Sequence, residues 1–275
     1  MKKKILVLFL TGILALLLLA CGGTSSTDET DDSNVAKEKE YLSDEQIDEL
    51  FHSPENFKGK YVKLIGKVFT TPEKSDKNIR LQLYYDIPNY DKNFIVYYTG
   101  TESIAIDDYL LIDGLIKGEF KGKNFIGSNV SVPLIETNKI EVTDYITAVV
   151  PTTKEITLTD STITQHDVSI TYEKIQFSDL ETRIYLSATN NSNDTFNLHT
   201  YSAKIIQNGQ QIEASFANYD ADYPEVATSL LAGASSSGII VFPALEETNF
   251  QIYLEGYSDN WELDFSPFAL EVPIN

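Results

Sequence analysis

The residue types that most often catalyse reactions or bind metals are few in this sequence, and they lie far apart. None of the three histidines has a second histidine or a cysteine two to five residues away, which is the spacing that zinc sites use. These histidines are His52, His166 and His199. Residues 235–237 are three serines, expected in a turn, and they lack the glycine-flanked elbow of serine hydrolases. No phosphate-binding loop or dinucleotide turn occurs. We therefore expect no catalytic residue, no metal site, no cofactor and no enzyme activity.

One loop carries two carboxylates close enough together to hold a cation. Asp220 and Asp222 lie between Tyr219 and Tyr223. A calcium ion takes roughly six to eight oxygen ligands, and the sequence offers no third or fourth ligand near these two. We expect a solvated loop here rather than a metal site.

The single cysteine stands at the end of a pattern that is typical of export signals. Three lysines at positions 2–4 precede an apolar run that ends at Cys21. Gly12 interrupts this run and makes it a poor membrane-spanning helix, which needs about 20 apolar residues in a row. Residues 18–21, Leu-Leu-Ala-Cys, resemble the lipobox of bacterial lipoproteins. An ordinary signal peptide or a single-pass anchor is the alternative.

The lipobox resemblance implies a place for the protein. It implies that Cys21 receives a lipid such as palmitate and becomes the mature N-terminus. The expected location is then the outer face of the cytoplasmic membrane, in a Gram-positive bacterium. The sequence does not say what the protein binds there.

The charge of the chain argues against a nucleic-acid partner. The formal net charge is −20, whereas phosphate binding needs clustered Lys and Arg. Residues 57–146 carry twelve basic and twelve acidic groups, whereas residues 147–275 carry four basic and eighteen acidic groups. Such a shift favours a domain boundary near residue 147. The lone cysteine excludes a disulfide within the chain, so packing and strand pairing must supply the stability.

Composition and turn signals predict an all-β chain with two folded domains. The expected organisation is a signal peptide (1–20), an acidic disordered tether (21–42), a barrel domain (43–146), a linker (147–154) and a sandwich domain (155–275). Ser43 and Gln46 have the spacing of a capping box and predict a short helix that ends at Pro54. The linker is expected to be extended, because residues 147–153 are largely β-branched.

Five strand patterns after this helix predict a small closed barrel. The ranges are 60–69, 78–85, 93–99, 109–119 and 123–130, with a hairpin at 118–122 and a bend at Gly66. Residues 57–68 and 108–118 resemble the OB-fold domains of the tRNA-anti-like kind in bacterial lipoproteins, although Asp107 stands where that pattern has glycine. The resemblance covers residues 57–146 and implies an OB-like five-stranded barrel with no catalytic residues.

Aromatic and basic residues of this domain could form a ligand face, as OB barrels often do. The candidate face consists of Tyr84, Tyr85, Tyr97 and Tyr98, with Lys63, Lys67 and Arg80 nearby in sequence. Neighbouring strand residues point to opposite sides, so at most half of each tyrosine pair can share a face. We favour the alternative that these tyrosines alternate into the core and that the lysines are solvated.

The remaining residues predict short strands packed as a sandwich. A change of phase within residues 167–177 indicates a bulge, Asn208 with Gly209 indicates a tight hairpin, and residues 261–265 are expected to form a late strand. Residues 185–192, 230–233 and 238–242 resemble the telokin-like, immunoglobulin-fold domain of unknown function common in Gram-positive lipoproteins, with Ala232 in place of the usual proline. This resemblance covers about residues 155–273. It implies an immunoglobulin-like sandwich that serves as an extracellular interaction module.

These observations together favour a non-enzymatic binding protein. We expect a membrane-anchored lipoprotein that contacts an envelope protein, peptide or glycan, and no nucleic acid. The alternative is a small-ligand protein whose barrel face holds a sugar or a nucleotide fragment. An enzyme is the least favoured hypothesis.

Overall fold

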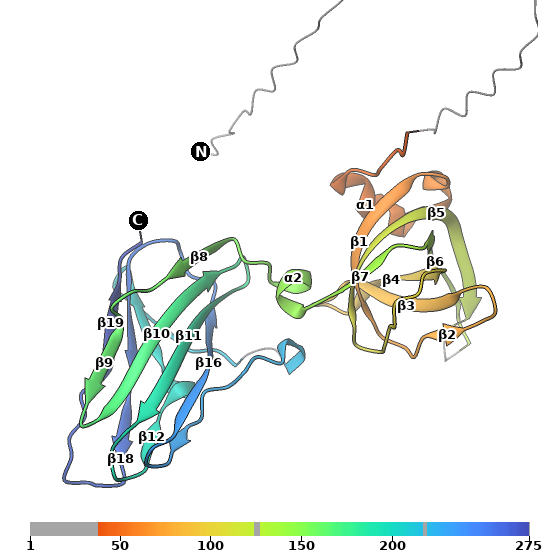
Figure 1. Ribbon diagram of the computed structural model, residues 1–275. Helices are drawn as coiled ribbons and strands as arrows, with labels where there is room; N and C mark the ends of the chain where they lie inside the picture. Colours follow the sequence, from red (N-terminus) through yellow and green to blue (C-terminus); the bar gives the residue numbers. More distant parts are fainter. Residues whose placement is uncertain (1–37, 124–126, 217–218, 275) are drawn as a thin grey trace, which may run out of the picture. The chain divides into compact units, whose positions relative to one another are not determined.

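The structure, a computed structural model, describes residues 38–123, 127–216 and 219–274. Lys39–Asn275 form one compact unit. The described residues are mainly β-strands with two α-helices, which confirms the expected all-β class. Strands β1 to β7 form one sheet, and β8 to β19, coloured green to blue, form three more (Figure 1). The expected signal peptide, the greater part of the tether and Cys21 lie outside the described residues.

The expected helix is present and covers part of the first hydrophobic core. Helix α1 spans Asp44–His52, and the short 3-10 helix η1 follows at Pro54–Phe57. The amide of Ser43 donates to the side chain of Gln46 at 3.0 Å, as a capping box requires. Ile47 and Leu50 are buried in the core, so packing stabilises a helix too short to persist alone.

The first sheet closes on itself through its strand pairing. Its members are β1 (Tyr61–Val68), β2 (Glu73–Lys74), β3 (Ile79–Asp86), β4 (Asp91–Tyr98), β5 (Tyr109–Lys123), β6 (Asn129–Thr137) and β7 (Ile140–Thr143). The pairing runs β1, β3, β4, β6, β5 and returns to β1, and β4 and β6 are parallel. We call this sheet the N-terminal ring. Gly66 lies where a Cβ atom would come within 2.8 Å of the Phe94 ring, which explains glycine in the middle of β1.

Two expectations for the N-terminal ring need correction. The hairpin expected at residues 118–122 and the strand expected at 123–130 are both wrong, because β5 continues to Lys123 and the next strand, β6, spans Asn129–Thr137. Gly118 instead has a φ of +102° beside a register shift, so this glycine marks a bulge and not a turn. The turn before β5 keeps a left-handed residue although it lacks glycine, since Asp107 has a φ of +70°.

The connector to the later strands begins as a helix and not as an extended segment. Helix α2 spans Tyr145–Val149, and the Asp144 side chain accepts from the amide of Thr147 at 2.7 Å. This N-cap stabilises a turn of helix in β-branched residues that favour strand by propensity alone. β8 begins at Lys154.

The remaining strands form three sheets, which we call the C-terminal sheets. The strands are β8 (Lys154–Thr157), β9 (Thr162–Gln165), β10 (Val168–Phe177), β11 (Glu181–Asn190), β12 (Phe196–Leu198), β13 (Lys204–Gln207), β14 (Gln210–Glu213), β15 (Ser229–Leu230), β16 (Ser235–Pro243), β17 (Phe250–Leu254), β18 (Gly256–Ser258) and β19 (Phe268–Val272). Their orders are β16-β11-β10-β8, with β9 on β10, then β15-β12-β18, and β14-β13-β17-β19. The 3-10 helices η2 (Thr200–Ser202) and η3 (Tyr219–Ala221) lie between strands.

Two local predictions for this region are confirmed and two are wrong. The bulge is confirmed by a register shift between Tyr172 and Lys174, and Asn208 and Gly209 both have positive φ, as a type I′ hairpin turn needs. The three serines at 235–237 pair within β16 and do not form a turn, which corrects that expectation. The strand expected at 261–265 is also wrong. The chain turns at this point, where the Glu262 amide donates to the Asn260 side chain at 3.2 Å, and Trp261 is 86% exposed.

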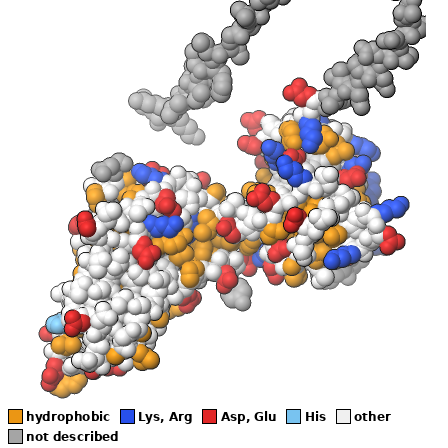
Figure 2. Space-filling model, viewed as in Figure 1, with side chains coloured by type: hydrophobic (Ala, Val, Ile, Leu, Met, Phe, Trp, Pro, Cys, Tyr) orange, Lys and Arg blue, Asp and Glu red, His pale blue; other side chains and the backbone are white. Residues whose placement is uncertain are grey.

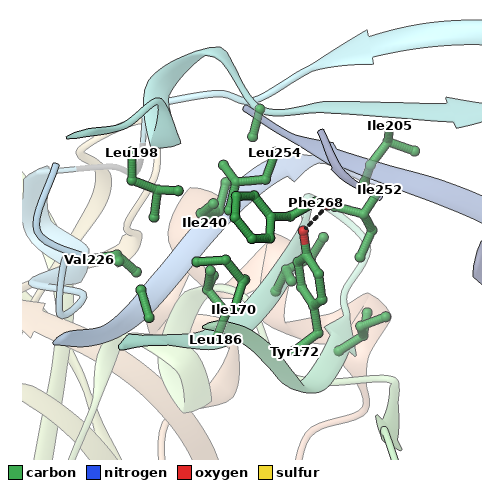
Figure 3. Close-up of a cluster of buried hydrophobic side chains, with 14 of the residues drawn as sticks. Ile170, Tyr172, Leu186, Leu198, Ile205, Val226, Ile240, Ile252, Leu254 and Phe268 are labelled. Atoms are coloured by element: carbon green, nitrogen blue, oxygen red, sulfur yellow. Dashed lines mark hydrogen bonds between the residues drawn. The ribbon is translucent and has the colours of Figure 1, made fainter. Parts of the chain in front are cut away.

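The core of the C-terminal sheets lies between strands β10, β11 and β16 on one side and β13, β17 and β19 on the other. Ile170, Leu186, Ile252 and Phe268 are among its fully buried members (Figure 3). Burying one such side chain stabilises the fold by about 1.5–3 kcal/mol. The hydroxyl of buried Tyr172 donates to the backbone oxygen of Phe268 at 2.7 Å, so its polar end is satisfied inside this core.

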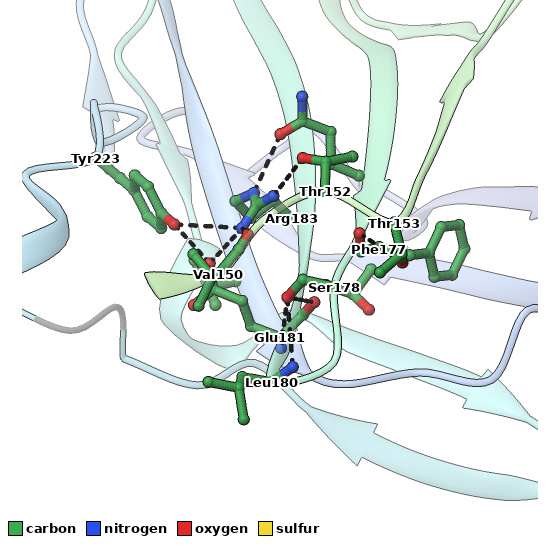
Figure 4. A network of polar contacts seen from close by, with 12 residues as sticks. Val150, Thr152, Thr153, Phe177, Ser178, Leu180, Glu181, Arg183 and Tyr223 are labelled. Atoms are coloured by element: carbon green, nitrogen blue, oxygen red, sulfur yellow. Dashed lines mark hydrogen bonds and ion pairs between the residues drawn. The ribbon is translucent and has the colours of Figure 1, made fainter. Parts of the chain in front are cut away.

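A buried arginine lies on the other face of β11. Arg183 is fully buried and its Nη1 lies 2.9 Å from Oε1 of Glu181 (Figure 4). The same guanidinium donates to the Val150 oxygen at 3.1 Å and to the Thr152 hydroxyl at 2.8 Å. It therefore fastens the connector to the C-terminal sheets. No local sequence pattern indicates this network, because Val150, Thr152 and Tyr223 lie 31 to 40 residues from Arg183 along the chain.

Candidate functional site

The structure places two of the four candidate tyrosines on the inner side of the N-terminal ring. Tyr98 is 2% exposed, and its hydroxyl accepts a hydrogen bond from the Glu102 amide at 3.0 Å. Tyr85 packs against the core, and its ring stacks on Phe51 beside α1's buried face, with centroids 5.1 Å apart. Neither residue presents a free ring to solvent.

The other two tyrosines lie on the outer side of the ring. Tyr84 is stacked on Phe69, with ring centroids 4.1 Å apart, and the Tyr90 ring meets its edge at 5.8 Å. Tyr97 is half-buried and pairs in register with Arg80 of β3. One face of Tyr84 is thus already covered, so the outer side offers less aromatic surface than the sequence suggested.

The basic groups near these tyrosines have partners of their own. Lys67 is buried, and its ammonium lies 2.8 Å from Asp220 and 3.5 Å from Asp107. Burial lowers the pKa of Lys67, but the hydrogen bond with Asp220 raises it, and the net pKa lies above its ordinary value. The same bond lowers the pKa of Asp220, which also accepts from the Tyr90 hydroxyl at 2.9 Å. Elsewhere Arg80 pairs with Glu73, and Lys63 lies over the Tyr41 ring. The outer side is therefore not a bare cationic surface.

A groove that the sequence did not reveal runs over β1, β5 and β7. Its volume is about 850 Å³, within the range of small-ligand sites. Apolar side chains of Ile65, Leu111 and Val142 line it. Charged side chains also line it, namely Lys63, Glu102, Asp113, Lys139 and Glu141. The groove was missed because β7 was not expected as a strand, and β7 supplies one of its walls.

A second and smaller cavity lies against strand β16 of the C-terminal sheets. Its volume is about 310 Å³. Its walls come from residues 200–201, 214–216, 222–223 and 225–226 and its floor from residues 239–241. Asp222 and Tyr223, noted in the sequence as members of a polar loop, belong to this wall, whereas Asp220 binds Lys67 instead. The two aspartates of that loop thus do not face a shared site.

The surface charge differs between the two strand systems. On the face drawn in Figure 2, Lys and Arg side chains gather on the N-terminal ring and are few on the C-terminal sheets. This distribution follows the sequence, in which residues 147–275 carry only four basic groups against eighteen acidic ones. A cation would thus meet the more favourable electrostatic potential at the C-terminal sheets.

The three histidines do not form a further site in the described part of the chain. Within the described ranges, no three potential ligands among His, Cys, Asp and Glu come together as a metal site. His52 and His166 each contact a backbone oxygen, of Asp48 and Asp264, and the His199 ring lies against Tyr257. No helix in the described part of the chain is long and apolar enough to cross a membrane. Cys21 lies outside that part.

Comparison with known proteins yields a likeness at the level of structure but none at the level of sequence families. No protein-family model matches the chain, and no curated protein matches it. A crystal structure of a functionally unknown protein from Listeria monocytogenes is similar to 46% of this chain and 88% of its own, at 10% identity and a TM-score of 0.33.

Proposed function

We propose that this protein is a lipid-anchored, non-enzymatic binding protein on the outer face of the cytoplasmic membrane of a Gram-positive bacterium. The anchor would be Cys21, the only thiol, at the end of the lipobox-like residues 18–21. The binding role rests on one observation, the groove of about 850 Å³ that apolar and charged side chains line together. Such a surface suits an amphipathic partner, namely an envelope protein, peptide or glycan.

The fold that belongs to this proposal is an OB-like barrel followed by an immunoglobulin-like sandwich. The barrel is supported by the closed pairing of the N-terminal ring and by its single parallel pair, β4 with β6. The sandwich is supported by a core shared between strands of two facing sheets. Both folds carry binding sites of many kinds, so the argument for function stays with the groove.

The anchor is tested by feeding cells labelled palmitate. The wild-type chain should incorporate label and sediment with membranes, and Cys21→Ser should do neither. A serine variant that still sediments with membranes would remove the lipid anchor from the proposal.

The groove is tested in living cells with a photo-crosslinking amino acid. Placed at Val142, which is 45% exposed in the groove, it should trap a discrete envelope partner. Placed at exposed Asp76, in the loop before β3, it should trap none. Equal products at both positions, or no product at Val142, would count against the groove as the binding surface.

A second candidate function has one observation in its favour. Tyr97 lies on the outer side of the N-terminal ring beside Arg80, where a sugar or nucleotide fragment could stack. Tyr97→Ala should then lower the affinity for such a ligand, whereas Tyr257→Ala, at an exposed position of β18, should leave it unchanged. Unchanged affinity in Tyr97→Ala and in Tyr84→Ala would eliminate this alternative.

A further inference from the structure

The cavity at β16 has an apolar floor on the side of the strand that faces away from the core. In β16 the core side chains are Ile240 and Phe242, so Ile239 and Val241 point to the opposite face by strand alternation. Both line the cavity. Two backbone bonds hold its walls over them, from the Ser215 amide to the Val241 oxygen and from the Ile239 amide to the Pro224 oxygen, each 2.8 Å long.

Aromatic rings surround this floor, and two of them are open to solvent. Phe216 is 85% exposed and Tyr201 is 59% exposed, and their ring centroids lie 5.9 Å apart. The third ring, that of Tyr223, is fixed because its hydroxyl donates to Glu181 at 2.6 Å. Burial raises the pKa of Tyr223, so this hydroxyl stays a donor at neutral pH. The cavity is therefore preformed on one side and open at the Phe216 edge.

The charged groups of the cavity are all acidic. Asp222 and Glu225 both line it, and its described lining residues include no lysine, arginine or histidine. The Tyr201 hydroxyl donates to Oε2 of Glu225 at 3.0 Å, which holds this carboxylate next to an aromatic ring. The cation nearest in the hydrogen-bond network, Arg183, is paired with Glu181. An anionic ligand would thus meet like charge here, and a cation would meet carboxylates and ring faces together.

We propose that this cavity binds a lysine or arginine side chain of a basic peptide segment in a partner protein. The aliphatic part of such a side chain is four or so atoms long and fits against the Ile239 and Val241 floor. Its charged end would lie at Glu225 and Asp222, with Tyr201 and Phe216 offering ring faces for cation–π contact. The volume of about 310 Å³ suits one long side chain better than a folded domain surface. The inference is independent of the membrane anchor.

Binding is tested with the full-length chain in a mild detergent and a fluorescein-labelled peptide that has a single central lysine. A second peptide carries norleucine at that position, which keeps the aliphatic stem and removes the charge. By fluorescence anisotropy the lysine peptide should bind, and the norleucine peptide should bind roughly tenfold more weakly. Equal affinity for the two peptides would overturn the proposal.

Matched variants of the protein locate the site. Glu225→Gln keeps an acceptor for Tyr201 and removes the charge, and Phe216→Ala removes an exposed ring. Each variant should lower the affinity for the lysine peptide by about threefold to tenfold. Glu271→Gln removes the same charge from an exposed position of β19 and should change affinity by less than about twofold. If Glu271→Gln weakens binding as much as Glu225→Gln, the attraction is a general effect of net charge and the cavity is not the site.

A free amine distinguishes the source of the cation. Spermidine should compete much less well than unlabelled lysine peptide, because it lacks the flanking backbone. Competition by spermidine at equal or lower concentration would show a polyamine site and would overturn the assignment to a peptide.

Discussion

Arg183 and Glu181 lie two residues apart on β11 and form an ion pair of 2.9 Å in a place that solvent barely reaches. Their side chains share the face of the strand opposite to the hydrophobic core, where the connector covers them. A charge buried in this way is stable only while its partner remains, because water cannot replace the lost contact.

Glu181→Ala should therefore lower the free energy of unfolding by about 3 kcal/mol or more, since it leaves the guanidinium buried and uncompensated. The double variant Arg183→Met with Glu181→Leu should lose much less, because both charges are removed together. Urea unfolding of the two variants and the wild type measures the difference. A double variant as unstable as Glu181→Ala would contradict this account.

Tyr172→Phe should cost about 1–2 kcal/mol of unfolding free energy, because the Phe268 oxygen is left without a donor inside the core. Tyr185→Phe is the matched control. Its hydroxyl donates to Gln176 at 2.8 Å in a part-buried place, so its loss should cost less. Equal stability of the two variants would show that burial does not increase the contribution of the Tyr172 hydrogen bond to the unfolding free energy.

Alkaline pH should destabilise the fold through Tyr109. Burial, the largest cause, raises the pKa of Tyr109 from 10.0 to about 12, although the charge of Lys67 opposes this. The folded state thus holds the proton more tightly, so this stabilisation is fully present below about pH 10 and is lost as pH rises toward 12. Unfolding free energies measured across this range should fall less steeply in Tyr109→Phe. An identical slope in the variant would show that other tyrosines cause the loss.

Gly238→Ala should both destabilise the fold and impair the cavity at β16. A Cβ atom there would lie 2.5 Å from the Val226 backbone nitrogen and 2.6 Å from the Pro224 oxygen, so residues 224–226 must move. Overpacking of this kind typically costs about 1–3 kcal/mol. The neighbouring change Ser237→Ala, which adds no atom, should leave the melting temperature and the affinity for a lysine peptide nearly unchanged. A Gly238→Ala variant that binds the lysine peptide like the wild type would contradict the link between this segment and the cavity.

The sequence predicted elements that depend on local pattern and failed where distant residues decide. The α1 capping box, the bulge after Tyr172 and the turn at Asn208 were found because each is encoded within a few neighbouring residues. Gly118 was misread, because a glycine at a bulge and one in a turn look alike until the partner strand is known. Strand alternation correctly predicted that the two tyrosines of each pair lie on opposite sides of the sheet. It could not show which of the two faces outward.

The cavity at β16 lay beyond sequence reasoning for a related reason. Its walls depend on Ser215 meeting Val241 and Pro224 meeting Ile239, contacts that no local pattern announces. One signal was available. β16 carries consecutive apolar residues, where a strand with one solvated face would alternate, and this indicates that both of its faces are covered.

The hydrogen bonds from Arg183 to the Val150 oxygen and the Thr152 hydroxyl affect how a pulling force is transmitted along the chain. Tension entering from the N-terminal side of the chain reaches these two residues before it reaches β8, which begins at Lys154. The guanidinium therefore transfers this force to β11, a central strand that pairs with a neighbour on each edge. Less of the force then reaches β8, which lies at the edge of the sheet.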